Sequence, residues 1–179
     1  AFVFCNREKG QAAGSDRFME LVESRSIPLV TLSSRRFRKE RDSRPWGELR
    51  EEFDRAVVQL LEPFEVDLAI NAGYMLIAAL LCSHFRMINL HPALPDGPQG
   101  MWQQVIWELI EKRADESGAM VHIVTEEVDE GPALTFCRFS TRGGELDEAW
   151  RSVDGKPLEE IREQSGEEHP LFIGLRQRG

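Results

Sequence analysis

The side chains best suited to chemistry stand at the end of a short apolar segment, Met87 to His91, which is expected to form a strand. Side chains alternate between the two faces of a strand, so Asn89 and His91 point the same way. A proline follows His91, at the carboxyl end of the strand, where open α/β sheets place their ligands. The amide can donate a hydrogen bond to a developing oxyanion, and the imidazole can act as a general acid or base.

A second strand end supplies a carboxylate. The apolar segment Val121 to Val124 is followed by a loop that contains Asp129. Asp129 could orient the imidazole of His91 and favour its charged form. This catalytic hypothesis requires an imidazole that solvent can reach and a carboxylate directed at it. A packing role for His91 and a merely polar role for Asp129 stay open, and His84 and His122 are interpreted as ordinary histidines.

Alternating strands and helices must position these groups. The near-continuous apolar run from Val66 to Ala72 is typical of a parallel strand covered on both faces. The alternation predicts a three-layer α/β fold with a mostly parallel sheet and right-handed crossovers. The expected strands are 1–6, 27–32, 66–72, 87–91, 118–124 and 133–140. The expected helices are one capped by Asp16, one from Ser43 to Pro63, and others over 79–83, 101–114, 158–164 and around 171–175, while 142–155 is expected to be a polar connection.

Length and composition narrow the class of protein. With 179 residues, 41% of them hydrophobic, the chain can build the core of one domain over residues 1–179. The net charge of −9 disfavours a nucleic-acid partner recognised through its phosphates. No apolar run reaches the roughly 18 residues of a membrane span, and no secretory leader is visible. We therefore expect a cytoplasmic protein without a membrane partner.

Cysteine usage and the basic residues add little to the function. Cys5, Cys82 and Cys137 are far apart in apolar segments, which predicts reduced thiols buried as small hydrophobes. No metal-ligand spacing is visible, so no metal is expected. The one basic run, residues 33–41, is expected to be a solvated loop, with attraction of an anionic substrate as the alternative.

Taken together, the run 89–94, Asn-Leu-His-Pro-Ala-Leu, and the later Asp-Glu-Gly-Pro at 129–132 resemble the folate-dependent formyltransferases. The resemblance is nearest to members that act on glycinamide ribonucleotide. It extends to 68–75, which is similar to the family's strand and pterin-side turn, and to 50–54, which is similar to its preceding helix. It covers most of the chain and implies a Rossmann-like formyltransferase fold.

The resemblance also implies a reaction and its residues. A formyl group would pass from 10-formyltetrahydrofolate, as co-substrate, to a small-molecule amine in purine biosynthesis, in a monomer or homodimer. The implied catalytic residues are Asn89, His91 and Asp129. The implied folate-binding residues are Arg50, Met75, Leu76, Ile77, Ala78, Asn89, Thr125, Glu126, Glu127, Val128 and Asp129. The implied contacts to the phosphate and ribose of the substrate are Gln164, Ser165, Gly166 and Glu167, although a solvent-facing segment is an open alternative for these four.

Some positions depart from the family pattern. Leu76 stands where many relatives carry an arginine, and Ala93 replaces a common serine. The loop 96–100, Asp-Gly-Pro-Gln-Gly, differs from the usual sequence beside the amine acceptor. The chain opens directly on a strand, so the family's first strand and its phosphate-binding loop are expected to be missing, as in an N-terminally truncated domain.

Other functions stay open. The same catalytic residues occur in formyltetrahydrofolate deformylase, which passes the formyl group to water. Formyltransferases that act on sugar nucleotides or on initiator methionyl-tRNA are further alternatives, although the acidic charge and the short C-terminal segment argue against the tRNA. A noncatalytic folate- or nucleotide-binding module is the alternative from another class.

Overall fold

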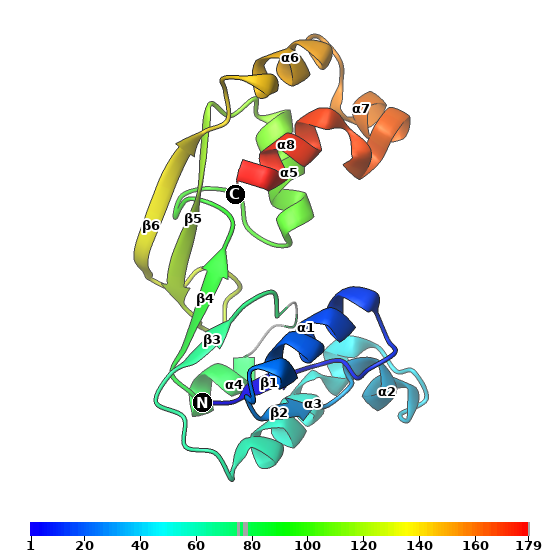
Figure 1. Cartoon of the computed structure of the whole chain (residues 1–179), viewed down its shortest axis with the longest axis vertical. Coiled ribbons are helices and arrows are strands. Elements are labelled where there is room, and N and C mark those ends of the chain that lie inside the picture. Colours follow the sequence, from blue (N-terminus) through cyan, green and yellow to red (C-terminus); the bar gives the residue numbers. More distant parts are fainter. Residues whose placement is uncertain (75, 77–78, 179) are drawn as a thin grey trace. The chain divides into compact units, whose positions relative to one another are not determined.

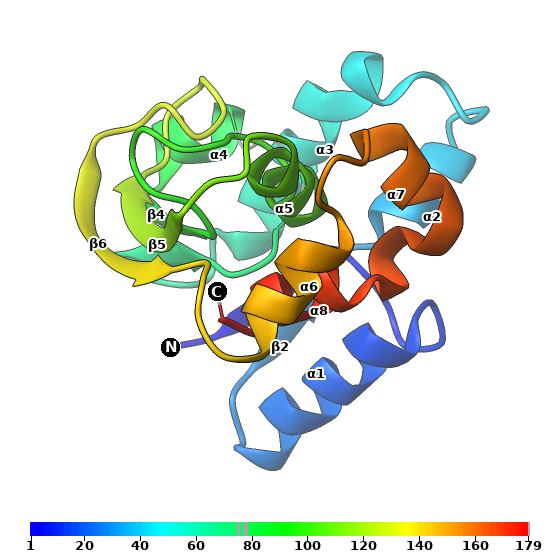
Figure 2. The same ribbon diagram turned by 90° about the horizontal axis from the view of Figure 1, so that it is seen from above.

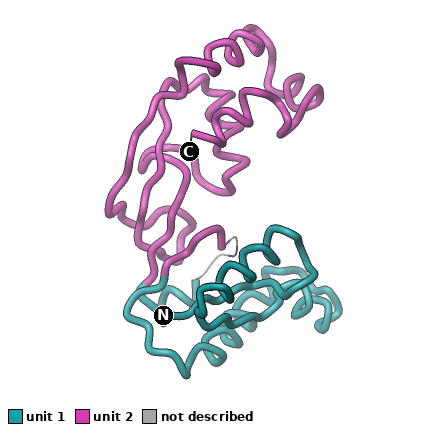
Figure 3. The backbone as a smooth tube through the Cα atoms, viewed as in Figure 1, with its two compact units in different colours: residues 1–69, 78–86 teal, residues 70–77, 87–179 magenta. Residues whose placement is uncertain are grey.

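The computed structural model describes residues 1–74, 76 and 79–178 (Figure 1). The chain separates into two compact units (Figure 3). The N-terminal unit comprises residues 1–69 and 78–86, and the C-terminal unit comprises residues 70–77 and 87–179. Each unit is described by itself.

The N-terminal unit contains a two-stranded parallel sheet, in which Val3 pairs with Leu29 and Cys5 with Thr31. The third helix carries an apolar face with the predicted helical spacing, because Leu49, Phe53, Val57 and Leu61 are all buried. The strands are β1 (Val3–Cys5) and β2 (Leu29–Thr31), and the helices are α1 (Ala13–Ser24), α2 (Ser34–Lys39), α3 (Trp46–Leu61) and α4 (Ala79–His84).

Asp16 does not cap the first helix, which corrects the prediction. Helix α1 begins at Ala13, so Asp16 lies in its first turn and accepts a hydrogen bond from the Gly10 backbone N–H at 3.0 Å. A carboxylate in the first turn still interacts favourably with the helix dipole. The prediction placed the carboxylate at the correct end of the helix but in the wrong position.

The second sheet has the strand order β3-β4-β5-β6. Its strands are β3 (Ala69–Asn71), β4 (Met87–His91), β5 (Glu116–Ile123) and β6 (Ala133–Ser140). Strand β5 is antiparallel to both β4 and β6. The predicted α/β class is confirmed, with a mixed sheet in which the pairs β4–β5 and β5–β6 are antiparallel, unlike the parallel pairing expected for most of the sheet. The connection from β5 to β6 is a short loop without a helix, which suits an antiparallel pair and not a crossover.

In the C-terminal unit the helices α5, α6, α7 and α8 lie on one side of β4, β5 and β6, as Figures 1 and 2 show. Their buried core includes Trp107, Trp150, Leu171 and Phe172. The bounds are α5 (Trp102–Glu111), α6 (Glu145–Ser152), α7 (Leu158–Ser165), the 3₁₀ helix η1 (Gly166–Glu168) and α8 (Pro170–Arg178).

Two sequence-based expectations fail in this unit. Residues 142–155 are not merely connective, because α6 buries Leu146, Ala149 and Trp150 on one face. The Trp150 indole N–H donates to the Thr141 carbonyl at 2.8 Å, which fixes the helix against the end of β6. Cys137 is exposed, not buried, because it lies on β6, whose residues are almost all exposed.

Candidate active site

A cluster of four polar side chains lies in the C-terminal unit. Asn89 and His91 come from β4, His122 comes from β5, and Asp129 comes from the loop after β5. The antiparallel register places Asn89 directly opposite His122, so their side chains share one face of the sheet. Both histidines are 2% exposed. We call these four residues the Asp129 cluster.

Asp129 is the centre of the cluster. Its Oδ1 accepts from Asn89 Nδ2 at 3.4 Å, and its Oδ2 accepts from the Gly100 backbone N–H at 3.1 Å. His91 Nδ1 lies 3.5 Å from Oδ2, and His122 Nε2 lies 3.5 Å from Oδ1. Its side chain is only 9% exposed, so the Asn89 amide and the Gly100 N–H replace water that a carboxylate otherwise needs.

The hydrogen bonds of Asn89 and His122 form a consistent chain. His122 Nδ1 lies 2.9 Å from the carbonyl of Ile123, which requires a proton on Nδ1. Its Nε2 is then free to accept from Asn89 Nδ2, at 3.1 Å. The two amide hydrogens of Asn89 are therefore directed at His122 and at Asp129.

His91 is enclosed between two oxygen acceptors. Its Nε2 lies 2.8 Å from the Pro98 carbonyl, and its Nδ1 faces Asp129. A neutral imidazole can donate to one of these acceptors and a protonated imidazole to both. The expectation that Asp129 is directed at His91 is confirmed. The expectation that solvent can reach the imidazole is wrong, because the Pro98 carbonyl in the loop 96–100 contacts His91 Nε2.

Glycine is required where the Asp129 loop returns to the sheet. A Cβ on Gly131 would lie 1.7 Å from the Ile123 carbonyl oxygen, far inside contact distance. The adjacent Pro132 carbonyl accepts from the Ile123 N–H at 3.0 Å, which closes the loop on β5. Asp129 itself has φ of 56°, a left-handed conformation that aspartate tolerates better than most residues. These features hold the carboxylate over the strand ends.

The other residues predicted in the Asp129 loop lie in the same segment but face outward. Thr125 Oγ1 donates to the Glu127 carbonyl at 3.1 Å, and the side chains of Glu126, Glu127 and Val128 are exposed. Leu76 lies in a loop and is half-buried. The predictions for Met75, Ile77 and Ala78 fall outside the described residues.

The predicted substrate contacts lie at the end of α7 and in η1. Gln164, Ser165 and Glu167 are exposed, and Gly166 has φ of 52°. The Gln164 side chain donates to Glu160 Oε1 on its own helix at 2.9 Å. Within the described part of the chain, no hydrogen bond joins these four residues to the Asp129 cluster.

Arg50 lies in the N-terminal unit and is not a freely solvated arginine. Its Nε lies 3.2 Å from Asp54 Oδ1, and the side chains are 14% and 0% exposed. Burial raises the pKa of the Asp54 carboxyl, and the charge of Arg50 opposes that shift. Three buried atoms here have no hydrogen-bond partner among the described residues: Trp46 Nε1, Arg50 Nη2 and Asp54 Oδ2.

Two features of these regions were missed at the level of sequence. His122 was interpreted as ordinary, and only the antiparallel register reveals that it faces Asn89. The second missed feature is the buried pair of Asp54 with Arg50. The sequence signals this pair, because Asp54 comes one turn after Arg50 on the same side of the helix.

The described residues contain no group of three histidine, cysteine or acidic side chains arranged to hold a metal ion, even where two histidines and Asp129 meet. Among the same residues, none of the helices has the length and apolar character needed to span a membrane.

Comparison of the sequence and the structure with known proteins identifies the family of this chain. The chain is 28% identical over 102 residues to phosphoribosylglycinamide formyltransferase of Escherichia coli, covering 55% of this chain and 47% of that protein. It thus spans about half the length of this curated relative. The structure of the phosphoribosylglycinamide formyltransferase of Campylobacter jejuni matches with a TM-score of 0.64 at 24% identity, over 99% of this chain and 79% of that one.

A formyltetrahydrofolate deformylase of Pseudomonas syringae also matches, with a TM-score of 0.58 at 22% identity, over 99% of this chain and 51% of that one. These structural likenesses confirm the expected fold. The family model described as formyl transferase matches residues 1–139, which contain the whole Asp129 cluster. The chain therefore belongs to the formyl transferase family.

Proposed function

We propose that this chain transfers a formyl group from 10-formyltetrahydrofolate to an amine, and that the amine is glycinamide ribonucleotide in purine biosynthesis. The observation that carries the proposal is the convergence of Asn89, His91 and Asp129 in one largely buried cluster. The cluster lies in the segment that the formyl transferase model matches. The named relatives from Escherichia coli and Campylobacter jejuni support this acceptor over others.

The cluster can stabilise the charge that develops during transfer. Asn89 and protonated His91 would each direct an N–H at the formyl oxygen as the amine adds to the formyl carbon. Asp129 would balance the charge of His91 and help to remove the proton of the amine, through water. The proton lost by the amine ends on the folate nitrogen that leaves as its bond to the formyl carbon breaks.

The loop 96–100 must move for this chemistry to occur. The Pro98 carbonyl holds His91 Nε2 at 2.8 Å, and the Gly100 N–H holds Asp129 at 3.1 Å. One of the two amide hydrogens of Asn89 must also turn from its present partner toward the substrate. Catalytic hydrogen bonds often reach their final geometry only when substrate is bound.

The ligand contacts implied by the resemblance remain proposals. Arg50 Nη2 is a buried donor without a partner among the described residues, and so suits a carboxylate of the folate. The exposed residues Gln164 and Glu167 can hydrogen-bond phosphate and ribose hydroxyls. We also propose that residues 1–179 act as one formyltransferase domain, because the family match crosses both compact units.

The direct test is a formyl-transfer assay on the full chain, with 10-formyltetrahydrofolate and glycinamide ribonucleotide. Asn89→Ala removes one donor to the oxyanion and should lower kcat by about 10²- to 10³-fold. His91→Ala should lower kcat at least as much. His84→Ala is the matched control, because His84 is an exposed histidine that contacts its own helix, at 3.0 Å from the Leu80 carbonyl. Unchanged turnover in Asn89→Ala or His91→Ala would contradict the proposal.

Hydrolysis of the formyl donor is the second candidate, favoured by the structural match to a deformylase. The two reactions separate when tetrahydrofolate release is measured with and without glycinamide ribonucleotide. Release that depends on the amine supports transfer, whereas equal release without it supports hydrolysis. Binding of a folate analogue in calorimetry without either reaction would support the noncatalytic alternative, in which His91 stays enclosed.

A further inference from the structure

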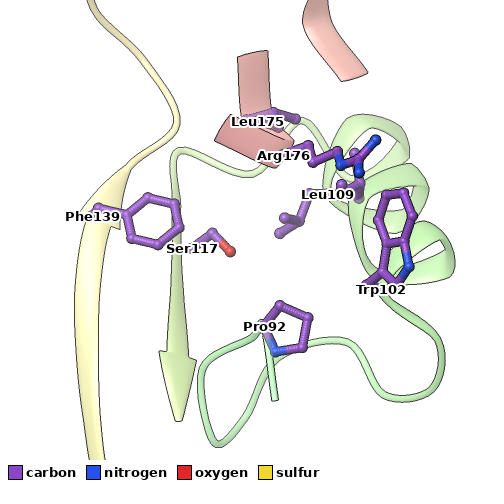
Figure 4. Close-up of a pocket in the computed structure, with 8 residues that line it drawn as sticks. Pro92, Trp102, Leu109, Ser117, Phe139, Leu175 and Arg176 are labelled. Carbon is purple, nitrogen blue, oxygen red and sulfur yellow. The ribbon is translucent and has the colours of Figure 1, made fainter. Parts of the chain in front are cut away.

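The C-terminal unit contains a cavity of about 160 Å³ between its sheet and two of its helices (Figure 4). Ser117 of β5 and Phe139 of β6 are paired in the register of these two strands and form one side of the cavity. Trp102 and Leu109 of α5 form another side, and Arg176 of α8 also lines the cavity. None of these five residues takes part in the proposed formyl transfer.

The Ser117 hydroxyl points into this cavity, as Figure 4 shows. Ser117 is 3% exposed, and no hydrogen bond of its hydroxyl is found within the described part of the chain. The oxygen itself is not fully enclosed by protein, so it can be reached from the cavity and can hydrogen-bond a polar group there. A polar group inside the cavity would satisfy Ser117.

Arg176 supplies the one charge of the lining. Its guanidinium carbon lies 4.6 Å from the centre of the Trp102 ring, and no carboxylate pairs with it in the part of the chain that is described. Arg113, Arg138 and Arg142 of the same unit each contact an acidic side chain, at 3.0, 2.6 and 2.9 Å. Arg176 therefore has donors available for an anion.

We infer that this cavity is a second small-molecule site, which takes a compact apolar carboxylate such as an aromatic acid. The apolar lining suits a ring, Ser117 can hydrogen-bond a polar atom of the ligand, and Arg176 can hold the carboxylate. The size is appropriate, because an apolar cavity of about 150 Å³ accommodates one benzene molecule. The inference does not rest on the proposed formyl transfer.

The test uses benzoate as the charged probe and benzyl alcohol as a neutral probe of similar shape, each titrated into the full chain by calorimetry. Benzoate should bind on the order of tenfold more tightly than benzyl alcohol, as expected for a hydrogen bond to a charged group. Arg176→Gln should abolish this preference. Arg162→Gln is the matched control, because Arg162 also lies over a tryptophan ring, 5.0 Å from the centre of Trp107, but does not line the cavity.

A second variant tests the cavity itself. Ser117→Leu should fill the space and block both probes, provided that circular dichroism shows a folded chain. If Ser117→Leu does not fold, the Arg176→Gln and Arg162→Gln pair still decides the matter, because neither variant changes a buried position. Failure of benzoate to bind, equal binding of both probes, or an equal effect of the two arginine variants would overturn the inference.

Discussion

Asp129 in the C-terminal unit and Asp54 in the N-terminal unit are both removed from solvent, but their surroundings differ. Asp129 accepts from an amide and from a backbone N–H, and two imidazoles lie 3.5 Å away. Asp54 has one side-chain partner, Arg50, and its Oδ2 has no hydrogen bond among the described residues.

The difference shows two ways of burying a carboxylate. The groups around Asp129 come from two strands and from the loop 96–100, so removing one of them leaves others in place. Asp54 has one charged partner, an arginine four residues earlier on the same helix, beside a backbone hydrogen bond from Leu80, and a buried charge that loses its charged partner is strongly destabilising. We therefore expect the Asp54 region to be the more fragile one, although it lies outside the proposed catalytic groups.

The largest effect on stability is expected for Arg50→Leu. The substitution leaves Asp54 buried without its partner and should lower the free energy of unfolding by about 3–5 kcal/mol at neutral pH, measured by urea denaturation. Arg55→Leu is the control on the same helix, because Arg55 and Glu51 are both 67% exposed. That exposed pair should change stability by about 0.5 kcal/mol or less. Equal losses in the two variants would remove the distinction between Asp54 and an ordinary surface carboxylate.

The penalty of Arg50→Leu should also depend on pH. The pKa of Asp54 is raised above its usual 3.8 by burial, so the folded protein holds this proton more tightly than the unfolded chain. The stability linked to that proton is fully present below about pH 3.8 and is lost as pH rises through the folded pKa. The loss in Arg50→Leu should therefore shrink as pH is lowered toward 4. A penalty that stays constant from pH 7 to pH 4 would contradict this account.

Gly131→Ala tests how firmly the Asp129 loop is held. The new Cβ would lie 1.7 Å from the Ile123 carbonyl oxygen, so the backbone must shift. Overpacking of this kind should destabilise the chain by about 1–3 kcal/mol, measured by thermal unfolding. Gly47→Ala is the control: no atom lies within 4 Å of its added Cβ, and alanine is the better helix former. A stable Gly131→Ala variant with full formyl-transfer activity would show that the loop tolerates displacement.

The sequence predicted the convergence at Asp129 because the rules involved are local. Strand alternation places Asn89 and His91 on one face, and a loop that follows a strand brings Asp129 to the same edge of the sheet. His122 could not be assigned in this way, because its position opposite Asn89 depends on the register between two strands. The contact between His91 and Pro98 was also out of reach, because it involves a backbone carbonyl that residue types do not reveal.

The errors in the fold have physical causes as well. Apolar strands favoured a parallel sheet, although β5 buries alternate residues over most of its length, as an antiparallel strand with one covered face does. Helix α6 was overlooked because its charged residues outweighed the spacing of Leu146, Ala149 and Trp150. In α6 the periodicity of the apolar residues held the answer, whereas in β5 the buried alternate residues include Gly118 and His122, so the apolar pattern did not reveal the covered face.

The smallest effect on stability is expected at His169. This residue extends the comparison of buried ionisable groups from the carboxylates Asp54 and Asp129 to a histidine, which becomes positive when protonated. Its Nδ1 accepts from the Leu171 N–H at 3.1 Å, at the start of α8, and a protonated ring cannot make this bond. Burial, and then the charge of Lys156, lower the pKa of His169 below 6.5. The folded chain thus binds this proton less tightly than the unfolded chain, so the stability linked to His169 is present above about pH 6.5 and is lost as pH falls through the folded pKa.

His169→Asn should weaken that dependence, because an amide oxygen can accept the same bond without titrating. Urea denaturation at pH 7.5 and pH 5 should show a smaller difference in the variant than in the natural chain. Lys156→Gln is the companion variant: removing the positive charge should raise the pKa of His169 toward its ordinary value and also reduce the loss at pH 5. An unchanged pH dependence in both variants would mean that acid destabilises the chain through groups other than His169.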